Sequence, residues 1–130
     1  MIEYGIRDGV AVVTVDNPPV NALGPGVLEA LADAVTRAAG DPAASAVVVA
    51  GAGRTFVAGA DITVFRTLRT REQALARSGG LHARLRQIED CPKPVVAALH
   101  GTALGGGLEL AMACHFRRSE EHTSELQSRF

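Results

Sequence analysis

The amino-acid sequence predicts an α/β fold built around a parallel sheet. Two short runs rich in valine and alanine, residues 46–50 and 94–99, have the length and β-branched character of buried strands. Their neighbours in sequence have helical character, and strands separated by helices pair most simply in parallel. A glycine-rich turn follows each run. Because crevices at the carboxyl ends of such strands are the usual ligand sites of open α/β sheets, these turns are the first candidates for function.

The first forty residues predict a β-hairpin followed by a helix. Residues 2–7 and 10–16 flank an Asp-Gly pair, which is a favoured two-residue hairpin turn. An Asn-Pro-Pro sequence ends the second strand, because proline cannot donate to a strand ladder. A helix is expected over residues 25–40, with a proline at its start and a glycine at its end.

Two further helices are expected. Residues 71–90 place four apolar side chains on one side of a helix, and a Cys-Pro pair ends it. Gly79 and Gly80 each cost about 1 kcal/mol relative to alanine, which leaves a break in this helix open. Residues 108–114 suit a helix that follows the strand at 94–99 and its glycine-rich turn.

Composition excludes several function classes. The formal net charge is −1 and there is no basic stripe, so nothing indicates a nucleic-acid partner. The apolar runs are too short to cross a bilayer. The first residues lack the regions of a signal peptide, so we expect a cytoplasmic protein. Cys91 and Cys114 are too few for a disulfide framework and are expected to be buried free thiols.

The two glycine-rich turns do not match nucleotide-binding motifs. In the first turn, Phe56 stands where the third glycine of a dinucleotide fingerprint would be, and no helix starts there. In the second turn, Gly101 and Gly106 have the spacing of a phosphate-binding loop, but Gly107 replaces its lysine.

The second turn instead combines hydrogen-bond donors with an acid. Glycines at 105–107 allow close approach to the backbone, and the first N–H groups of the following helix have no partner within it. Such donors, at the positive end of the helix dipole, can bind an oxygen that becomes negative during a reaction. Glu109 lies three residues after Gly106, so one helical turn puts both on the same face. The turn is therefore a candidate catalytic site.

Two segments also resemble a known family. Residues 56–62 (FVAGADI) and 101–111 (GTALGGGLELA) together closely resemble the crotonase superfamily of enoyl-CoA hydratases and isomerases. The resemblance covers nearly all of residues 2–117 and implies a crotonase-like (ClpP/crotonase) fold of repeated ββα units, truncated after the helix that carries Glu109. Residues 17–23 and 113–117 resemble the hydratase region of multifunctional fatty-acid oxidation enzymes, in which a 3-hydroxyacyl-CoA dehydrogenase follows on the same chain.

The resemblance implies a site and a reaction. The backbone N–H groups of Ala60 and Gly106 would form an oxyanion hole for the thioester carbonyl as water adds to a 2-enoyl-CoA. Glu109 would be one of two glutamates that hold and activate this water. No metal or redox cofactor is implied, because the coenzyme A thioester is itself the substrate, and the parent enzyme would be a homo-oligomer or fused to the dehydrogenase. The positions that match the acyl-CoA path of the family are Ala22, Ala58, Asp61, Ile62 and Leu104.

The resemblance stops at Arg117. Residues 118–130 have no counterpart in the family and look like a translated sequencing adapter, although a genuine polar helix is the alternative. The second glutamate of the family lies further along the chain than this point. We therefore expect a partial hydratase/isomerase domain over residues 1–117, and little or no activity from the 130-residue chain alone.

Other interpretations of these residues stay open. For Asp61, capping of the short helix that follows it is favoured over contact with the substrate. The glycines at 105–107 would also permit tight strand–helix packing, and Glu109 would also suit an exposed surface position. The alternatives to a hydratase are a double-bond isomerase and a non-catalytic acyl-CoA-binding scaffold.

Overall fold

The computed structural model describes residues 1–24, 26–58, 71–101 and 103–119, without the side chains of residues 74–79 and 104. Within these ranges the main sheet has five strands in the order β1-β2-β3-β5-β7. Strands β1 and β2 are antiparallel, and every later pairing in this sheet is parallel. The predicted α/β class is thereby confirmed. The strands are β1 Ile2–Arg7, β2 Val10–Val15, β3 Ala46–Gly51, β5 Val95–Leu99 and β7 Phe116–Ser119.

The predicted hairpin forms between β1 and β2. Arg7 pairs with Val10, so the turn contains Asp8 and Gly9. Both residues have positive φ, 52° and 80°, as the tight turns that match strand twist require. Asp8 tolerates this conformation better than most side chains do, and Gly9 adopts it freely.

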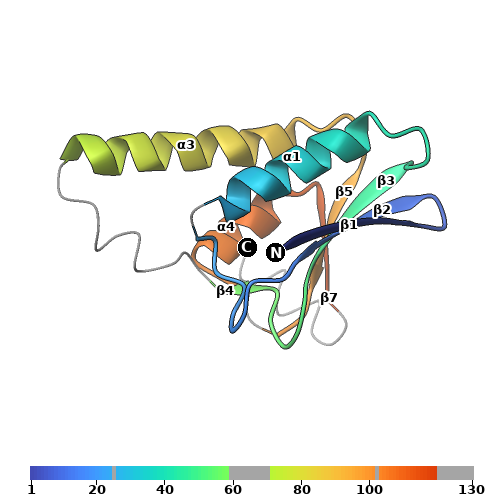
Figure 1. The fold of residues 1–130 in the computed structure, drawn as a ribbon, viewed down its shortest axis with the longest axis horizontal. Helices are drawn as coiled ribbons and strands as arrows, with labels where there is room; N and C mark the ends of the chain where they lie inside the picture. Colours follow the sequence, from blue (N-terminus) through green and yellow to red (C-terminus); the bar gives the residue numbers. More distant parts are fainter. Residues whose placement is uncertain (25, 59–70, 102, 120–130) are drawn as a thin grey trace.

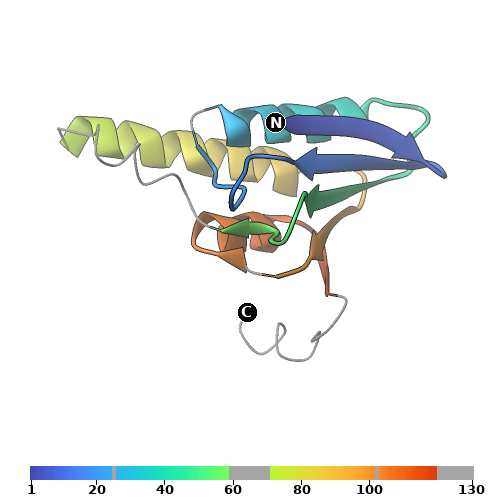
Figure 2. The ribbon, with the colours of Figure 1, turned by 60° about the horizontal axis from the view of Figure 1, so that its bottom comes forward.

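Helix α1 (Val27–Ala39) covers one face of the sheet, and helix α3 (Arg71–Glu89) packs beside α1 and extends beyond the sheet (Figures 1 and 2). Alternate residues of the inner strands point into this layer, as the period of two in a strand requires. Full burial of one valine or leucine side chain contributes roughly 1.5–3 kcal/mol, so this layer is the main source of stability. The fully buried strand and α1 residues at its centre are Ala11, Val13, Val15, Leu31, Ala32, Val35, Val47, Val49, Val95 and Ala97.

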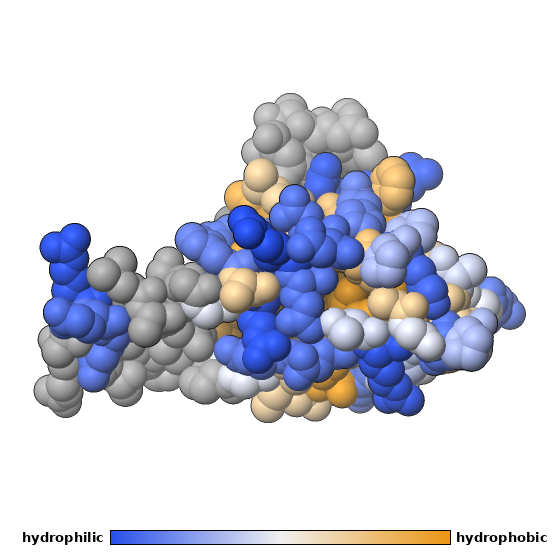
Figure 3. Space-filling model, turned by 90° about the horizontal axis from the view of Figure 1, so that it is seen from above, coloured by the Kyte–Doolittle hydropathy of each residue, from blue (hydrophilic) through white to orange (hydrophobic). Residues whose placement is uncertain are grey.

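The two long helices differ slightly from the sequence prediction. Helix α1 begins at Val27, after Gly26 with φ 82°, and it ends at Gly40 as predicted. Helix α3 runs without interruption through Gly79 and Gly80, so the break that the sequence left open does not occur. Seen from the helix side, the described surface is mostly hydrophilic (Figure 3). This is the pattern of helices that bury one face and expose the other.

A second, two-stranded sheet was not predicted. Strands β4 (Val57–Ala58) and β6 (Ala103–Leu104) pair in parallel. Helix α4 (Gly106–Ala113) follows β6 and begins two residues earlier than the predicted start at 108. Strand β7 then returns beside β5 and continues to Ser119, past Arg117. Arg118 and Ser119 join the sheet through backbone groups, which every residue except proline carries in full. Their pairing therefore does not test whether residues 118–130 come from a translated sequencing adapter, and that origin stays a prediction.

Candidate functional site

The candidate site lies where strands β4 and β6 end. Val57 pairs with Ala103, and Ala58 pairs with Leu104. Because the pair is parallel, the chain leaves both strands at the same edge. Gly106 stands two residues after Leu104, as Ala60 stands two residues after Ala58. The structure thus places the strands that precede the two loops side by side, while residues 59–61 of the first loop lie outside the described residues.

The start of helix α4 presents backbone N–H groups that have no acceptor within the helix. Gly105 has φ 53° and ψ −116°, and no side chain caps the helix. The Glu109 N–H donates to the Gly105 carbonyl over 3.0 Å, which is the first bond of the helical ladder. The N–H groups of Gly106 and Gly107 precede this bond and have no acceptor within the helix. An anionic oxygen at this end would also meet the positive pole of the helix dipole.

Gly107 has a packing role as well. It is buried, and a Cβ atom built on it would overlap the carbonyl oxygen of Val57. Only a glycine lets helix α4 approach strand β4 this closely. The packing interpretation of the glycines therefore applies to Gly107, while Gly106 is half-buried and lies beside the open edge.

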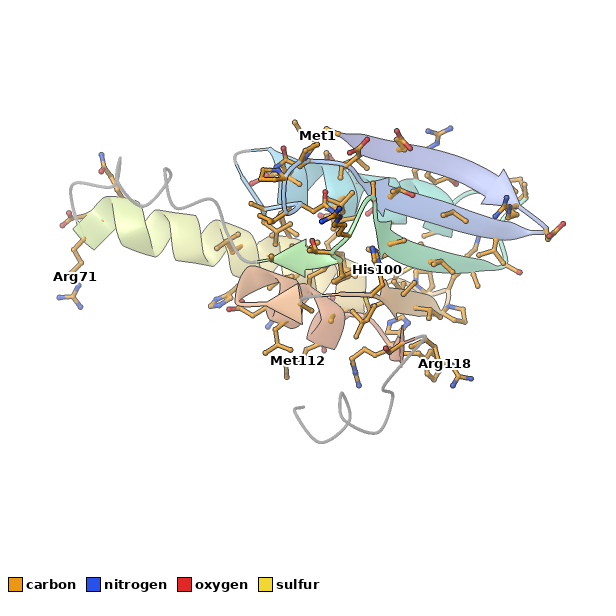
Figure 4. The ribbon with its side chains drawn as sticks, turned by 90° about the horizontal axis from the view of Figure 1, so that it is seen from below. Met1, Arg71, His100, Met112 and Arg118 are labelled. Carbon is orange, nitrogen blue, oxygen red and sulfur yellow. The ribbon has the colours of Figure 1, made fainter. Side chains whose placement is uncertain are left out.

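Glu109 lies in the first turn of α4 with its side chain exposed. Its neighbours Leu110 and Ala111 are buried, and Met112 is 54% exposed. Glu109 and Met112 are thus on the solvent side of the helix, as Figure 4 shows for Met112. Among the described residues, no hydrogen-bond or ion-pair partner contacts the Glu109 carboxylate.

The other predicted positions divide into two groups. Ala22 and Ala58 are described and half-buried, and the Ala22 carbonyl accepts a hydrogen bond of 2.8 Å from the Asn17 side chain. The backbone of Leu104 is part of β6. Predictions for Ala60, Asp61 and Ile62 fall outside the described residues.

A separate cavity of about 590 Å³ opens at the carboxyl ends of β3, β5 and β7. His100, labelled in Figure 4, contributes to it, and its Nε2–H donates to the Gly53 carbonyl over 2.9 Å. None of the predicted site residues lines this cavity. Its lining is Ala50, Ala98, Leu99, His100, Arg118 and Ser119.

The two cysteines are free and buried, as predicted. Burial raises the pKa of the Cys114 thiol to about 12, so this side chain is a neutral packing group and not a nucleophile. His115 also has a structural role: its Nδ1 accepts from the Val95 N–H, and its Nε2–H donates to the Glu89 carbonyl. Over the described ranges, no cluster of three or more metal-ligating side chains was found, and no helix is long and apolar enough to cross a membrane.

Sequence reasoning assigned no role to Asn21, the one polar side chain that is buried among the described residues. Its amide joins the loop before α1 to the turn that leads into β4. A single sequence offers little signal for it, because asparagine is common in exposed loops.

Comparison with known proteins identifies the family. The model of the enoyl-CoA hydratase/isomerase family matches residues 5–128. The chain belongs to this family. It is 42% identical over 120 residues to a probable enoyl-CoA hydratase of Bacillus subtilis (strain 168), and 44% identical over 112 residues to the peroxisomal bifunctional enzyme of Danio rerio. These matches cover 92% and 86% of this chain.

Solved structures support the family and its crotonase fold. An enoyl-CoA hydratase/carnithine racemase from Magnetospirillum magneticum superimposes with a TM-score of 0.85 at 39% identity, over 91% of this chain. The chain spans about half the length of two of these relatives: 46% of the Bacillus protein and 45% of the Magnetospirillum chain. It spans 15% of the Danio rerio enzyme.

Proposed function

We propose that residues 1–117 are the N-terminal half of an enoyl-CoA hydratase that acts in fatty-acid β-oxidation. The observation that carries the proposal is the parallel β4–β6 pair, which directs two chain segments to one edge beside the uncapped start of α4. Relatives named as enoyl-CoA hydratases and as fatty-acid β-oxidation enzymes support it.

The proposed reaction adds water across the double bond of a trans-2-enoyl-CoA. The water oxygen bonds to the β-carbon, and the electron pair of the double bond moves toward the thioester carbonyl as an enolate. The N–H groups of Ala60 and Gly106 would stabilise this oxygen, and each donor of this kind is typically worth about 3–4 kcal/mol. Glu109, with a second carboxylate, would take a proton from the water, and this pair of acids would return one proton to the α-carbon as the enolate collapses. The reaction as proposed uses no metal or redox cofactor.

The decisive test is hydration of crotonyl-CoA, followed by the loss of its conjugated absorbance. It requires a full-length enzyme, either from the uninterrupted gene or as residues 1–117 joined to the C-terminal half of the Bacillus subtilis relative. We expect turnover by this enzyme, and little or none by the 130-residue chain. Turnover by the 130-residue chain at the full-length rate would contradict the proposed need for further residues.

Glu109→Gln in the full-length enzyme should lower kcat by about 100- to 10,000-fold, the usual contribution of a general acid or base. Glu89→Gln is the matched control, because Glu89 is another exposed glutamate, at the end of α3. Unchanged hydration in Glu109→Gln would remove Glu109 from the mechanism. Binding of acyl-CoA with no turnover would favour a scaffold, and conversion of 3-enoyl-CoA to 2-enoyl-CoA without hydration would favour an isomerase.

The partners and location of the full-length enzyme are part of the same proposal. Relatives from Danio rerio and Cucumis sativus are named bifunctional and multifunctional enzymes. Fusion to a 3-hydroxyacyl-CoA dehydrogenase is therefore one proposed arrangement, and a homo-oligomer is the other. We propose a cytoplasmic location, whereas several relatives are named peroxisomal.

A further inference from the structure

Asn21 is 3% exposed, and its side chain makes four hydrogen bonds. The Nδ2 group donates to the carbonyls of Ala52, Thr55 and Phe56 over 2.8, 3.0 and 3.0 Å. Its Oδ1 accepts from the Asn17 N–H over 2.9 Å. Burying an amide is unfavourable unless it is hydrogen-bonded, so this set of bonds holds the side chain in one orientation.

The three carbonyls belong to the turn between β3 and β4, residues 52–56. The same turn is held from its other side by His100, whose carbonyl accepts from the Phe56 N–H over 2.9 Å and whose ring donates to Gly53. A Cβ on Gly51 would overlap the carbonyl oxygens of the returning chain, so the turn is tightly closed. Asn21 therefore fastens a compact turn to the loop that precedes α1.

These contacts fix both sides of strand β4. Asn21 holds the carbonyl of Phe56, which directly precedes the strand. Its chain neighbour Val20 accepts a hydrogen bond of 3.0 Å from the N–H of Ala58, the last residue of the strand. On its other side, β4 pairs with β6 and contacts α4 through Gly107. A shift of the Asn21 loop would thus move β4 relative to the start of α4.

Resting on the hydratase function proposed above, we propose that Asn21 is a positioning residue for the reaction: it holds the end of β4 in register with β6, and so sets the place of the thioester beside the Gly106 N–H. Asn21 touches neither the substrate nor the reacting atoms in this proposal. Displacement of a reacting group by about 1 Å can cost roughly 100-fold in rate, so a loosened β4 would be visible in kcat.

The backbone conformation of Asn21 is an alternative explanation for asparagine at this position, and it is testable. Asn21 has φ 56°, a conformation that asparagine and glycine tolerate better than other residues. Asn21→Gly keeps this backbone conformation and removes the amide, whereas Asn21→Asp keeps the shape and replaces the donor with a carboxylate. We expect kcat to fall roughly 10- to 100-fold in both variants of the full-length enzyme, with KM changed by less than about threefold.

The matched control is Lys93→Met. Lys93 Nζ also donates to backbone carbonyls, those of Ala38 and Asp41, but it precedes β5, whereas the candidate site follows the carboxyl end of that strand. We expect this control to lower Tm by a few degrees, about as much as the Asn21 variants do, without a loss of kcat. A loss of kcat in Lys93→Met equal to that in the Asn21 variants would reduce Asn21 to a general stability role and overturn the inference.

A spectroscopic measurement separates this inference from the proposed function. The absorption band of a bound conjugated dienoyl-CoA moves to longer wavelength when its carbonyl accepts strong hydrogen bonds. We expect this shift in the parent enzyme and in Lys93→Met, and a smaller shift in both Asn21 variants. A parent enzyme that shows the shift but hydrates no enoyl-CoA would refute the hydratase and leave the positioning role supported.

The remaining outcomes count against the positioning role. Full kcat and a full band shift in Asn21→Gly would show that the backbone conformation alone is required. A parent enzyme without either turnover or band shift would remove the site on which the inference rests.

Discussion

The backbone polar groups near the two ends of strand β5 differ in whether a side chain forms hydrogen bonds with them. At its amino end, Lys93 donates hydrogen bonds of 2.9 and 2.8 Å to the carbonyls of Ala38 and Asp41, which lie at and just past the end of α1. At its carboxyl end, the chain continues into β6 and α4, and no side chain of the described residues caps the start of α4 at Gly105. One end satisfies backbone carbonyls with a side chain, whereas at the other end the first N–H groups of the helix have no side-chain cap within the described ranges. The first end therefore contributes to stability, and the second is the end at which we propose that the substrate carbonyl binds.

The largest expected effect is a loss of kcat from substitution of Gly106, at the uncapped start of α4. Gly106 is the first residue of α4, a position where proline fits a helix. Gly106→Pro therefore removes one N–H group, while Gly106→Ala keeps it. In the full-length enzyme we expect the proline variant to lose about 100- to 1,000-fold in kcat, the cost of one oxyanion-hole donor.

Circular dichroism and crotonyl-CoA kinetics on both variants would check this result. Equal kcat values for Gly106→Pro and Gly106→Ala, with helix content retained, would show that the N–H group of Gly106 takes no part in the reaction.

A smaller effect, on stability alone, is expected at the amino end of β5, where Lys93 bonds to the backbone. Lys93→Met keeps the apolar stem and removes a charged donor from two carbonyls, so the free energy of unfolding should fall by about 1–3 kcal/mol. Urea unfolding of the 130-residue chain would measure this loss. An unchanged unfolding midpoint would mean that water replaces the lysine without cost.

The smallest expected effect is the dependence of stability on pH that arises from Asp41, near the same end of β5. The Ala43 N–H and then the Tyr4 hydroxyl donate to the Asp41 carboxylate, and these bonds hold its pKa below the ordinary value of 3.8. Because the folded-state pKa is lowered, the ionised group stabilises the fold above pH 3.8, and this contribution is lost as the pH falls through the lower folded value.

Tyr4→Phe removes one of the two donors, so its stability should depend less on pH below 3.8 than that of the parent chain. Urea midpoints measured through this range for both proteins would test it. Parallel curves would indicate that the Ala43 N–H alone lowers the pKa of Asp41.

The sequence predicted those parts of the fold that depend on local patterns. The Asp8–Gly9 turn, helix α1 and strands β3 and β5 follow from turn residues, helical periodicity and short apolar runs. The continuity of α3 through Gly79 and Gly80 could not be predicted, because a cost of about 1 kcal/mol for each glycine leaves both a continuous and a broken helix possible.

Long-range contacts account for what the sequence missed. Strands β4 and β6 have two residues each, too few for any periodicity, and they exist because their backbones meet. Asn21 is buried only because the turn after β3 folds over it. For the site, the motif resemblance named Gly106 and Glu109, while the close contact of Gly107 with Val57 required coordinates.

Both cysteines of the chain lie in the interior, and the Cys114 thiol stays protonated at any pH used for maleimide coupling. A third cysteine, introduced on an exposed position such as Met112, would therefore be the preferred point of attachment in the folded protein. A fluorophore or spin label placed there would report directly on helix α4, without first replacing the native thiols.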